Sequence, residues 1–272
     1  SELGPFRELL RPVRQHLAVP LSAIYRDDSQ GEQLRSFATD TLADYLSDDP
    51  EALFDLLADA DQKQFPVIYN KLAVHQLQAI ELGGAEVTKE AADGADEEDK
   101  EALAIKKANA AAMLLRLGAP DEVWSLLRHS PDPRVRSYII HWLSPLGVNP
   151  VVIADRFKVE LDITIRRALL LCLGEFDESQ LSDSQRTGLI ETLLNVYRSD
   201  ADAGLHAAAE WLLRQWKQGD QIAMIDTELQ HTEEELRAAE EKSRQWYVNG
   251  QGQTFVILDA KSFQMGSPSS DE

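Results

Sequence analysis

The sequence of 272 residues has a single cysteine and no long apolar run. A disulfide needs two cysteines, so Cys172 forms no internal cross-link, and a chain of this length can bury a sizeable core without one. No stretch of 18 or more apolar residues occurs, and no transmembrane helix is expected. The N-terminal segment SELGPFRELLRPVRQHL carries charges where a signal peptide needs an apolar run. The chain begins with Ser1, so a targeting signal upstream of this segment would not be visible in it.

Basic residues are also scarce, with 27 lysines and arginines against 47 aspartates and glutamates, a formal net charge of −20. A general nucleic-acid binder needs a basic face that displaces counterions, and docking on an anionic membrane needs the same sign of charge. Both classes are therefore disfavoured, and a protein partner with a basic surface is favoured. The lone Cys172 lies in RRALLLCLGEF on an apolar face, where we expect a small buried hydrophobe instead of a reactive thiol. A reducing compartment, and hence a cytoplasmic location for this segment, fits this cysteine usage.

The motifs that mark common active sites are missing. The sequence has no H-E-x-x-H, G-x-G-x-x-G, Walker, kinase catalytic-loop or G-x-S-x-G pattern, and DGADEED does not follow the spacing of a calcium-binding loop. Six histidines are scattered along the chain. His206 and Glu210 are four residues apart, a spacing that can hold a metal or provide a base, but a surface pair is the favoured interpretation. We therefore predict no catalytic residue, metal ligand or cofactor site in this chain.

Helical periodicity dominates what is present. The segment DDPEALFDLLADA predicts a helix with Asp49 as its N-cap and Pro50 at its first position. A helix over FPVIYNKLAVHQLQAIELGG is expected to stop at Gly83-Gly84, another ends at Gly118, and DEVWSLLRH predicts the next. Between them, residues 85–101 contain eight acids and two lysines, which predicts a solvated loop of low order between two helical lobes.

Three segments of the second half align without gaps: DPRVRSYIIHWLSPL, DITIRRALLLCLGEF and DAGLHAAAEWLLRQW. Each begins with an aspartate, has an aliphatic residue three positions later, and then a basic or potentially basic residue. These nine positions are Asp132, Val135, Arg136, Asp162, Ile165, Arg166, Asp202, Leu205 and His206. A fainter copy lies upstream, with Leu34 and Arg35 at the second and third positions and Gly31 in place of the aspartate.

Each class of repeat position has a physical role. The aspartate can cap the helix N-terminus by accepting a bond from a free backbone N–H. The apolar residues that follow trace one face of a 3.6-residue helix, which must be covered by neighbouring helices. We expect Arg136 and Arg166 to reach an acidic side chain in the neighbouring repeat, and His206 to make a hydrogen bond between repeats.

This pattern of Asp-x-x-aliphatic-Arg at the start of a helix resembles HEAT-like repeats, over roughly residues 26–216. The resemblance implies an all-α fold, a HEAT-like α-solenoid of antiparallel helix pairs, which acts as a scaffold and a partner-binding surface. An irregular helical bundle is the alternative.

The C-terminal segment differs in character. WYVNGQGQTFVIL contains strand formers at 254–258, DAKS is a turn, and FQMGSP predicts a second short strand. This pair resembles the entry to the formylglycine-generating enzyme, or sulfatase-modifying-factor, domain, with Phe263, Met265, Gly266 and Ser267 as the matching residues. The resemblance implies that the catalytic cysteines and metal ligands of that domain lie beyond Glu272, and Cys172 matches none of them. An isolated hairpin is marginal, so it is expected to pack on the helices, pair with another segment or fray.

The chain as a whole resembles the middle of large bacterial multidomain proteins in which a helical-repeat segment precedes such a domain. The expected organisation is a helical lobe over 1–84, an acidic loop over 85–101, HEAT-like repeats over 102–217, a connecting helix over 218–245 and the start of the next domain over 246–272. The expected function is a non-catalytic scaffold that contacts a protein partner and its own C-terminal domain. The alternative is a fragment of an enzyme, an oxidase of the formylglycine-generating type or a protein kinase, whose catalytic residues lie outside this chain.

Overall fold

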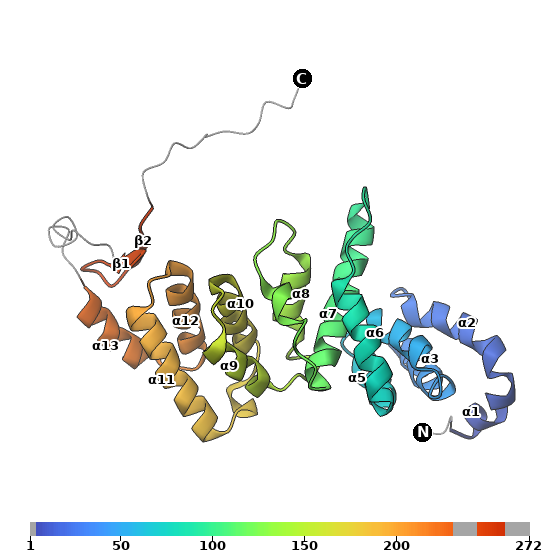
Figure 1. The fold of residues 1–272 in the computed structure, drawn as a ribbon. Coiled ribbons are helices and arrows are strands. Elements are labelled where there is room, and N and C mark those ends of the chain that lie inside the picture. The colour runs from blue at the N-terminus through green and yellow to red at the C-terminus, as the bar shows by residue number, and fades with distance from the viewer. Residues whose placement is uncertain (1–3, 231–243, 259–272) are drawn as a thin grey trace. The chain divides into compact units, whose positions relative to one another are not determined.

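The computed structural model describes residues 4–230 and 244–258 (Figure 1). Its internal contacts group the chain into two compact units, residues 1–186 and 187–272. The fold is mostly helical with two short strands, so the all-α prediction is confirmed. None of the helices within the described ranges combines the length and the apolar character that crossing a bilayer requires.

The first unit consists of consecutive helices that pack on their neighbours, α2 on α3, α4 on α5, α6 on α7, α7 on α8 and α9 on α10. Short 3₁₀ turns lie between some of them. The helices are α1 (Gly4–Leu10), α2 (Arg14–Arg26), α3 (Glu32–Tyr45), α4 (Pro50–Ala58), α5 (Phe65–Leu72), α6 (Gln76–Thr88), α7 (Glu97–Arg116), α8 (Arg134–Trp142), α9 (Pro150–Val159) and α10 (Ile163–Gly174).

The second unit contains most of α11 (Asp183–Ser199), then α12 (Ala203–Gln215), α13 (Gly219–Leu229) and a hairpin of β1 (Trp246–Val248) and β2 (Thr254–Val256). Helix α12 packs on α13, and α13 contacts β1. The two strands are antiparallel, with Tyr247 opposite Phe255, and their rings stack at 5.4 Å. Gly252 takes a positive φ of 75° in the turn that joins the strands.

The apolar repeat positions form the core of both units. Thirteen of the fifteen aligned apolar side chains are at most 5% exposed, while Val135 and Trp142 are half-buried. The buried set is Ile165, Leu205, Ile139, Leu169, Ala209, Cys172, Leu212, Leu143, Leu173, Leu213, Leu146, Phe176 and Trp216. The last three of these follow the ends of α8, α10 and α12. The helix-period pattern therefore identified the buried face correctly.

Side-chain caps set several helix starts. Asp49 accepts the N–H of Ala52, Asp162 those of Thr164 and Ile165, and Asp202 that of Leu205, as the sequence predicted. Asp132 differs, because α8 begins at Arg134 with Pro133 at the N-cap position. Asp132 lies one position before this N-cap, and its carboxylate accepts the N–H of Arg134, the first residue of α8, at 3.1 Å.

The prediction that a helix stops at Gly83-Gly84 was wrong, since α6 continues to Thr88. A Cβ on Gly83 would lie 2.6 Å from Met113 Cε and 3.1 Å from Leu114 Cδ2. The glycine therefore lets α6 approach α7 closely and does not end the helix.

The acidic segment is also more ordered than predicted. Residues 85–88 belong to α6 and residues 97–101 to α7, where Asp96 caps the helix and three acids occupy its first turn. Acidic side chains in the first turn are stabilised by the positive end of the helix dipole, a local effect that the low-order interpretation ignored. The connection is only 89–96, and the boundary between the two units falls at Arg186 and Thr187 instead of here.

Two further elements differ from their predictions. The segment DEVWSLLRH forms only a 3₁₀ turn, Trp124–Leu127, because Pro131 and Pro133 follow closely and leave no room for a longer helix. The strand at 254–256 pairs with 246–248, a partner that the sequence did not predict. The segment FQMGSP, including Phe263, Met265, Gly266 and Ser267, lies outside the described residues, as does most of the connecting helix beyond α13.

A pair of leucine substitutions tests the role of Gly83. Gly83→Leu should lower the free energy of unfolding by about 1–3 kcal/mol, because the new side chain overpacks the contact with Met113 and Leu114. At Gly84 an added Cβ meets only the flexible carboxylate of Glu122, and Gly84→Leu gains helix propensity, so its effect should stay within about 1 kcal/mol. Chemical denaturation of both variants measures this, and equal losses at the two positions would contradict the packing role.

Candidate functional site

The basic residue of each repeat contacts the end of the preceding helical element. Arg136 Nε donates to the carbonyl of Leu127 at 3.0 Å, and its Nη2 donates to the carbonyl of Thr164 at 3.4 Å. We expected an acidic partner, and the structure provides carbonyls instead. The last carbonyls of a helical turn have no intrahelical donor, so the half-buried guanidinium satisfies that of Leu127, which ends the 3₁₀ turn. Burial lowers the pKa of Arg136 from its usual value.

The same sequence spacing recurs three times. Arg136 contacts Leu127, and the guanidinium of Arg166 lies 5.1 Å from the ring centroid of Phe157. His206 binds the carbonyl of Tyr197. In all three cases the partner lies nine residues earlier, at or near the end of the preceding helix or turn.

The fainter copy makes a related contact. Arg35 Nε donates to the carbonyl of Tyr25 at 3.4 Å, ten residues earlier, and Gln64 donates to the same oxygen at 2.9 Å. We call the position of Arg35, Arg136, Arg166 and His206 the basic position of the repeat. Its side chain ties the start of one helix to the end of the element before it.

At the last basic position, His206 is fully buried between two aromatic rings. Its ring stacks on Tyr197 at 4.3 Å and on Trp246 of β1 at 3.6 Å, measured between ring centroids. Its Nδ1 lies 2.7 Å from the carbonyl of Tyr197, and its Nε2 lies 3.2 Å from Thr254 Oγ1 of β2. A carbonyl only accepts, so Nδ1 carries the proton, and a neutral ring then accepts from the Thr254 hydroxyl at Nε2.

The predicted surface pair of His206 with Glu210 was therefore wrong. Glu210 accepts instead from Nε and Nη2 of Arg214, at 2.9 and 2.7 Å. The histidine faces the core because the hairpin covers it, and the hairpin is forty residues further along the chain. We call His206, Tyr197, Trp246 and Thr254 the histidine cluster.

Further bonds hold the hairpin beside this cluster. Trp246 Nε1 donates to the carbonyl of Asp200 at 2.9 Å, and the N–H of Gln245 donates to the carbonyl of Ala201 at 2.9 Å. The guanidinium of Arg244 lies 4.8 Å from the Trp246 ring centroid. Trp246 is 1% exposed, so the indole is enclosed as well as hydrogen-bonded.

Burial sets the protonation state of His206. It lowers the pKa of the imidazole below the ordinary value of 6.5, and the carbonyl of Tyr197 opposes this in part. Glu210 and Asp226 raise the pKa and Arg244 lowers it. The ring is therefore neutral at pH 7, as its acceptor role at Nε2 requires.

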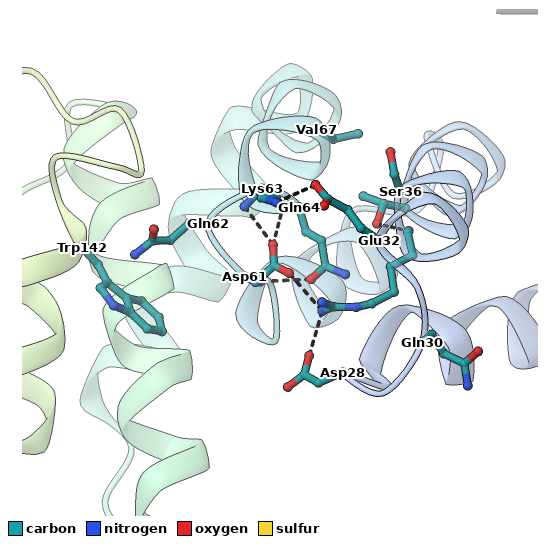
Figure 2. Close-up of a pocket in the computed structure, with 12 residues that line it drawn as sticks. Asp28, Gln30, Glu32, Ser36, Asp61, Gln62, Lys63, Gln64, Val67 and Trp142 are labelled. Carbon is teal, nitrogen blue, oxygen red and sulfur yellow. Dashed lines mark hydrogen bonds and ion pairs between the residues drawn. The ribbon is translucent and has the colours of Figure 1, made fainter.

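A hollow of about 620 Å³ lies beside the first basic position, within the first unit. It is lined by the α2–α3 turn, the α4–α5 turn, α3 and the end of α8, and Figure 2 shows Trp142 of α8 directed toward it. The lining residues that matter below are Asp28, Glu32, Arg35, Asp61, Lys63 and Trp142.

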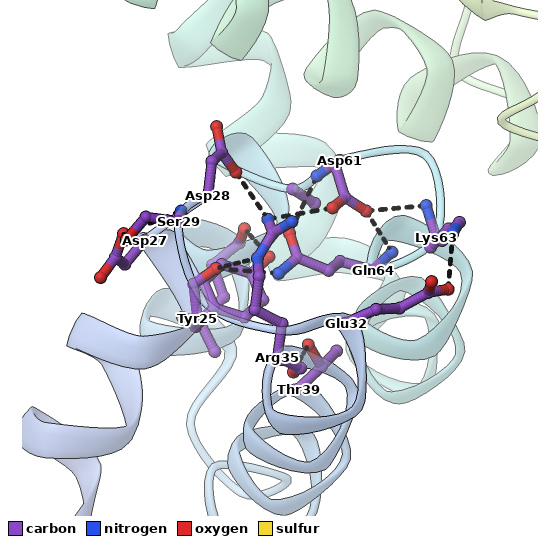
Figure 3. A network of polar contacts seen from close by, with 12 residues as sticks. Tyr25, Asp27, Asp28, Ser29, Glu32, Arg35, Thr39, Asp61, Lys63 and Gln64 are labelled. Carbon is purple, nitrogen blue, oxygen red and sulfur yellow. Dashed lines mark hydrogen bonds and ion pairs between the residues drawn. The ribbon is translucent and has the colours of Figure 1, made fainter.

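An ion-pair network forms the polar side of this hollow (Figure 3). Arg35 Nη2 lies 3.0 Å from both Asp28 Oδ1 and Asp61 Oδ2, and Lys63 Nζ lies 2.5 Å from Glu32 Oε1. Asp61 also accepts the main-chain N–H groups of Lys63 and Gln64 through its other oxygen. The network fixes the two turns relative to α3.

No cluster of three or more His, Cys, Asp or Glu side chains able to hold a metal ion is found among the described residues. Cys172 is fully buried, and burial raises its thiol pKa to about 12, so it behaves as the inert hydrophobe that the sequence indicated.

No protein-family model matches this sequence, and no curated protein or solved structure shows significant similarity to it.

Sequence reasoning missed half of the histidine cluster and the whole hollow. Trp246 and Thr254 stand in a segment that the sequence assigned to a separate domain, and no periodicity links them to α12. The one available signal was the replacement of arginine by histidine at the third basic position, since an imidazole can stack within a core more readily than a charged guanidinium.

Replacing Arg136 tests the carbonyl contact. Arg136→Met keeps the apolar stem but leaves the Leu127 and Thr164 carbonyls without this donor, and should lower the free energy of unfolding by about 1.5–3 kcal/mol. Arg128→Met, which removes a surface ion pair with Asp162, should cost at most about 1 kcal/mol. Denaturant titration compares the two, and a smaller loss at Arg136 than at Arg128 would refute the assigned role.

The histidine cluster should make stability depend on pH. Because the pKa of His206 is lower in the folded than in the unfolded protein, the unfolded state binds the proton more readily. The stabilising contribution is present above about pH 6.5 and is lost as pH falls below it toward the folded-state pKa.

Thermal unfolding from pH 7.5 to 5, followed by tryptophan fluorescence, measures this effect. In His206→Gln, which does not titrate, the decline across this range should be smaller than in the unmodified protein, while His141→Gln at an exposed site should retain it. Parallel curves for the unmodified protein and His206→Gln would show that His206 does not contribute.

Proposed function

We propose that this chain is a non-catalytic helical-repeat scaffold that holds a C-terminal domain in a defined position and offers a surface to a protein partner. The observation that carries this proposal is the histidine cluster, in which a buried side chain of α12 is sandwiched against the first strand of the hairpin. A flexible linker would have no need for such a contact.

The hairpin is tied to the helices by contacts of three kinds. Ring stacking joins His206 to Trp246, the indole N–H binds the carbonyl of Asp200, and the main chain of Gln245 binds that of Ala201. A two-stranded hairpin is marginal by itself, so these contacts supply the order that it lacks. Whatever follows β2 then leaves the helices from a fixed point and direction.

The helical part is proposed to be a HEAT-like solenoid of antiparallel pairs. Support comes from the recurring basic position, whose side chain contacts the residue nine positions earlier at Arg136, Arg166 and His206. It also comes from the packing of consecutive helices and from the burial of the aligned apolar positions. One local contact repeated at equivalent places favours a repeat architecture over an irregular bundle.

The domain that the hairpin enters is proposed to be of the sulfatase-modifying-factor type. This rests on the resemblance carried by Phe263, Met265, Gly266 and Ser267, outside the described residues. Any chemistry would belong to that domain, and the present chain would position it.

Spin-label distances test whether the hairpin is held. Labels on Gln215→Cys of α12 and Leu258→Cys after β2 both sit at exposed positions of the second unit, and Cys172 is too deeply buried to react. We expect one narrow distance distribution, which broadens in His206→Ala and in Trp246→Ala because the stacked contact is lost.

His141→Ala, at an exposed histidine of the first unit, is the matched control and should leave the distribution narrow. Circular dichroism verifies that each variant retains its helices. A broad distribution in the otherwise unmodified protein, or a narrow one in both cluster variants, would overturn the positioning role.

A further inference from the structure

The hollow beside Arg35 has one aromatic wall and a polar wall. Its volume of about 620 Å³ lies within the range of sites that enclose a ligand group. The polar wall consists of the two ion-paired turns, and the aromatic wall is Trp142 at the end of α8 (Figure 2). Both belong to the first unit.

The Trp142 ring is the aromatic part of this hollow. It is half-buried, and Tyr138 meets it edge-on at 4.5 Å between centroids. Two of the other four tryptophans have an arginine over the ring, Arg156 at 5.6 Å from Trp124 and Arg244 at 4.8 Å from Trp246. Among the described residues no cation lies over Trp142, whose ring borders the hollow instead.

The charges around the hollow favour a cation. Three carboxylates, Asp28, Glu32 and Asp61, face two cations, Arg35 and Lys63. The side chain of Asp28 is 89% exposed and that of Glu32 is 74% exposed, although each already has one ion-pair partner. The whole chain has a net charge of −20, which attracts basic partners over a longer range.

We propose that this hollow binds an arginine side chain from a basic segment of a partner protein. The guanidinium stacks on the face of Trp142, as Arg156 does on Trp124, and pairs with the exposed carboxylates of Asp28 and Glu32. Arginine fits better than lysine because its planar group both stacks and hydrogen-bonds. This rests on the proposed scaffold function and names the chemistry of its partner.

The chain itself contains a precedent for an extended segment at a basic position. At His206 the corresponding place is covered by the hairpin, whose Trp246 stacks on the imidazole. At Arg35, the equivalent position of the fainter copy, the hollow is open. An extended partner segment would cover the first basic position as the hairpin covers the last.

A peptide titration followed by NMR tests this proposal. The probe is the peptide acetyl-Gly-Gly-Arg-Gly-Gly-amide, added to the isotope-labelled chain, with the Trp142 indole signal identified from Trp142→Phe. We expect a saturable shift of that signal, a weaker one with the lysine peptide and none with the citrulline or glutamate peptides. Acetyl-arginine amide distinguishes a free guanidinium compound from a protein segment, and should bind more weakly than the peptide.

Two variants locate the site. Trp142→Phe should raise the Kd about threefold or more, because phenylalanine is the weaker cation–π partner. The double variant Asp28→Asn with Glu32→Gln should raise the Kd by more than Trp142→Phe does. The matched control, Asp155→Asn with Asp183→Asn, removes two other exposed charges and should leave the Kd within about twofold, and thermal unfolding checks that all variants fold.

Three outcomes would overturn the proposal. The first is equal affinity for the arginine and citrulline peptides, and the second is an unchanged Kd in both hollow variants. The third is a rise in Kd in the Asp155→Asn/Asp183→Asn control as large as in the hollow variants, which would show that binding follows net charge alone. The spin-label distance between α12 and β2 is independent of the hollow, so a narrow distribution with no peptide binding would reject this inference alone. A broad distribution would reject the positioning role instead.

Discussion

The structure depends on a short bond between a basic side chain at the start of one helix and the end of the element before it. Helix ends leave carbonyls without donors, and a helix array must satisfy them while keeping its apolar faces in contact. Arg136 donates to the carbonyl of Leu127, and His206 donates to that of Tyr197 from within the core. Because the bond fixes where consecutive helices meet, it also fixes which apolar residues face one another.

The exchange of arginine for histidine at the last repeat changes what that position can do. A guanidinium is always charged and only donates, whereas a neutral imidazole is flat, can be buried and accepts a bond at its second nitrogen. His206 therefore holds Tyr197 on one side and Trp246 and Thr254 on the other. The helix-to-helix tie becomes a helix-to-hairpin tie, and the burial that permits it also makes the contact sensitive to acid.

Charge is distributed in a way that supports the same division of roles. The His206, Tyr197 and Trp246 rings of the histidine cluster are buried, while the hollow beside Arg35 is open and bordered by carboxylates and an aromatic ring. The ion pairs of Arg35 hold the turns in place and still leave Asp28 largely in solvent. The second unit thus carries the internal anchor, and the hollow of the first unit is the place proposed for recognition of a separate chain.

The sequence by itself determined the helical class, the buried face of each repeat and the caps at Asp49, Asp162 and Asp202, because these follow from contacts within a few residues. It failed at Gly83, where the glycine looked like a stop signal but permits a close approach to Met113. It also failed in the acidic segment, where the dipole of α7 stabilises 97–101. Only the tertiary structure decided the partners of Arg136, the pairing of β2 with β1, the burial of His206 and the hollow at Trp142. Each of these joins residues that periodicity does not relate, and which distant surfaces meet depends on the packing of whole helices.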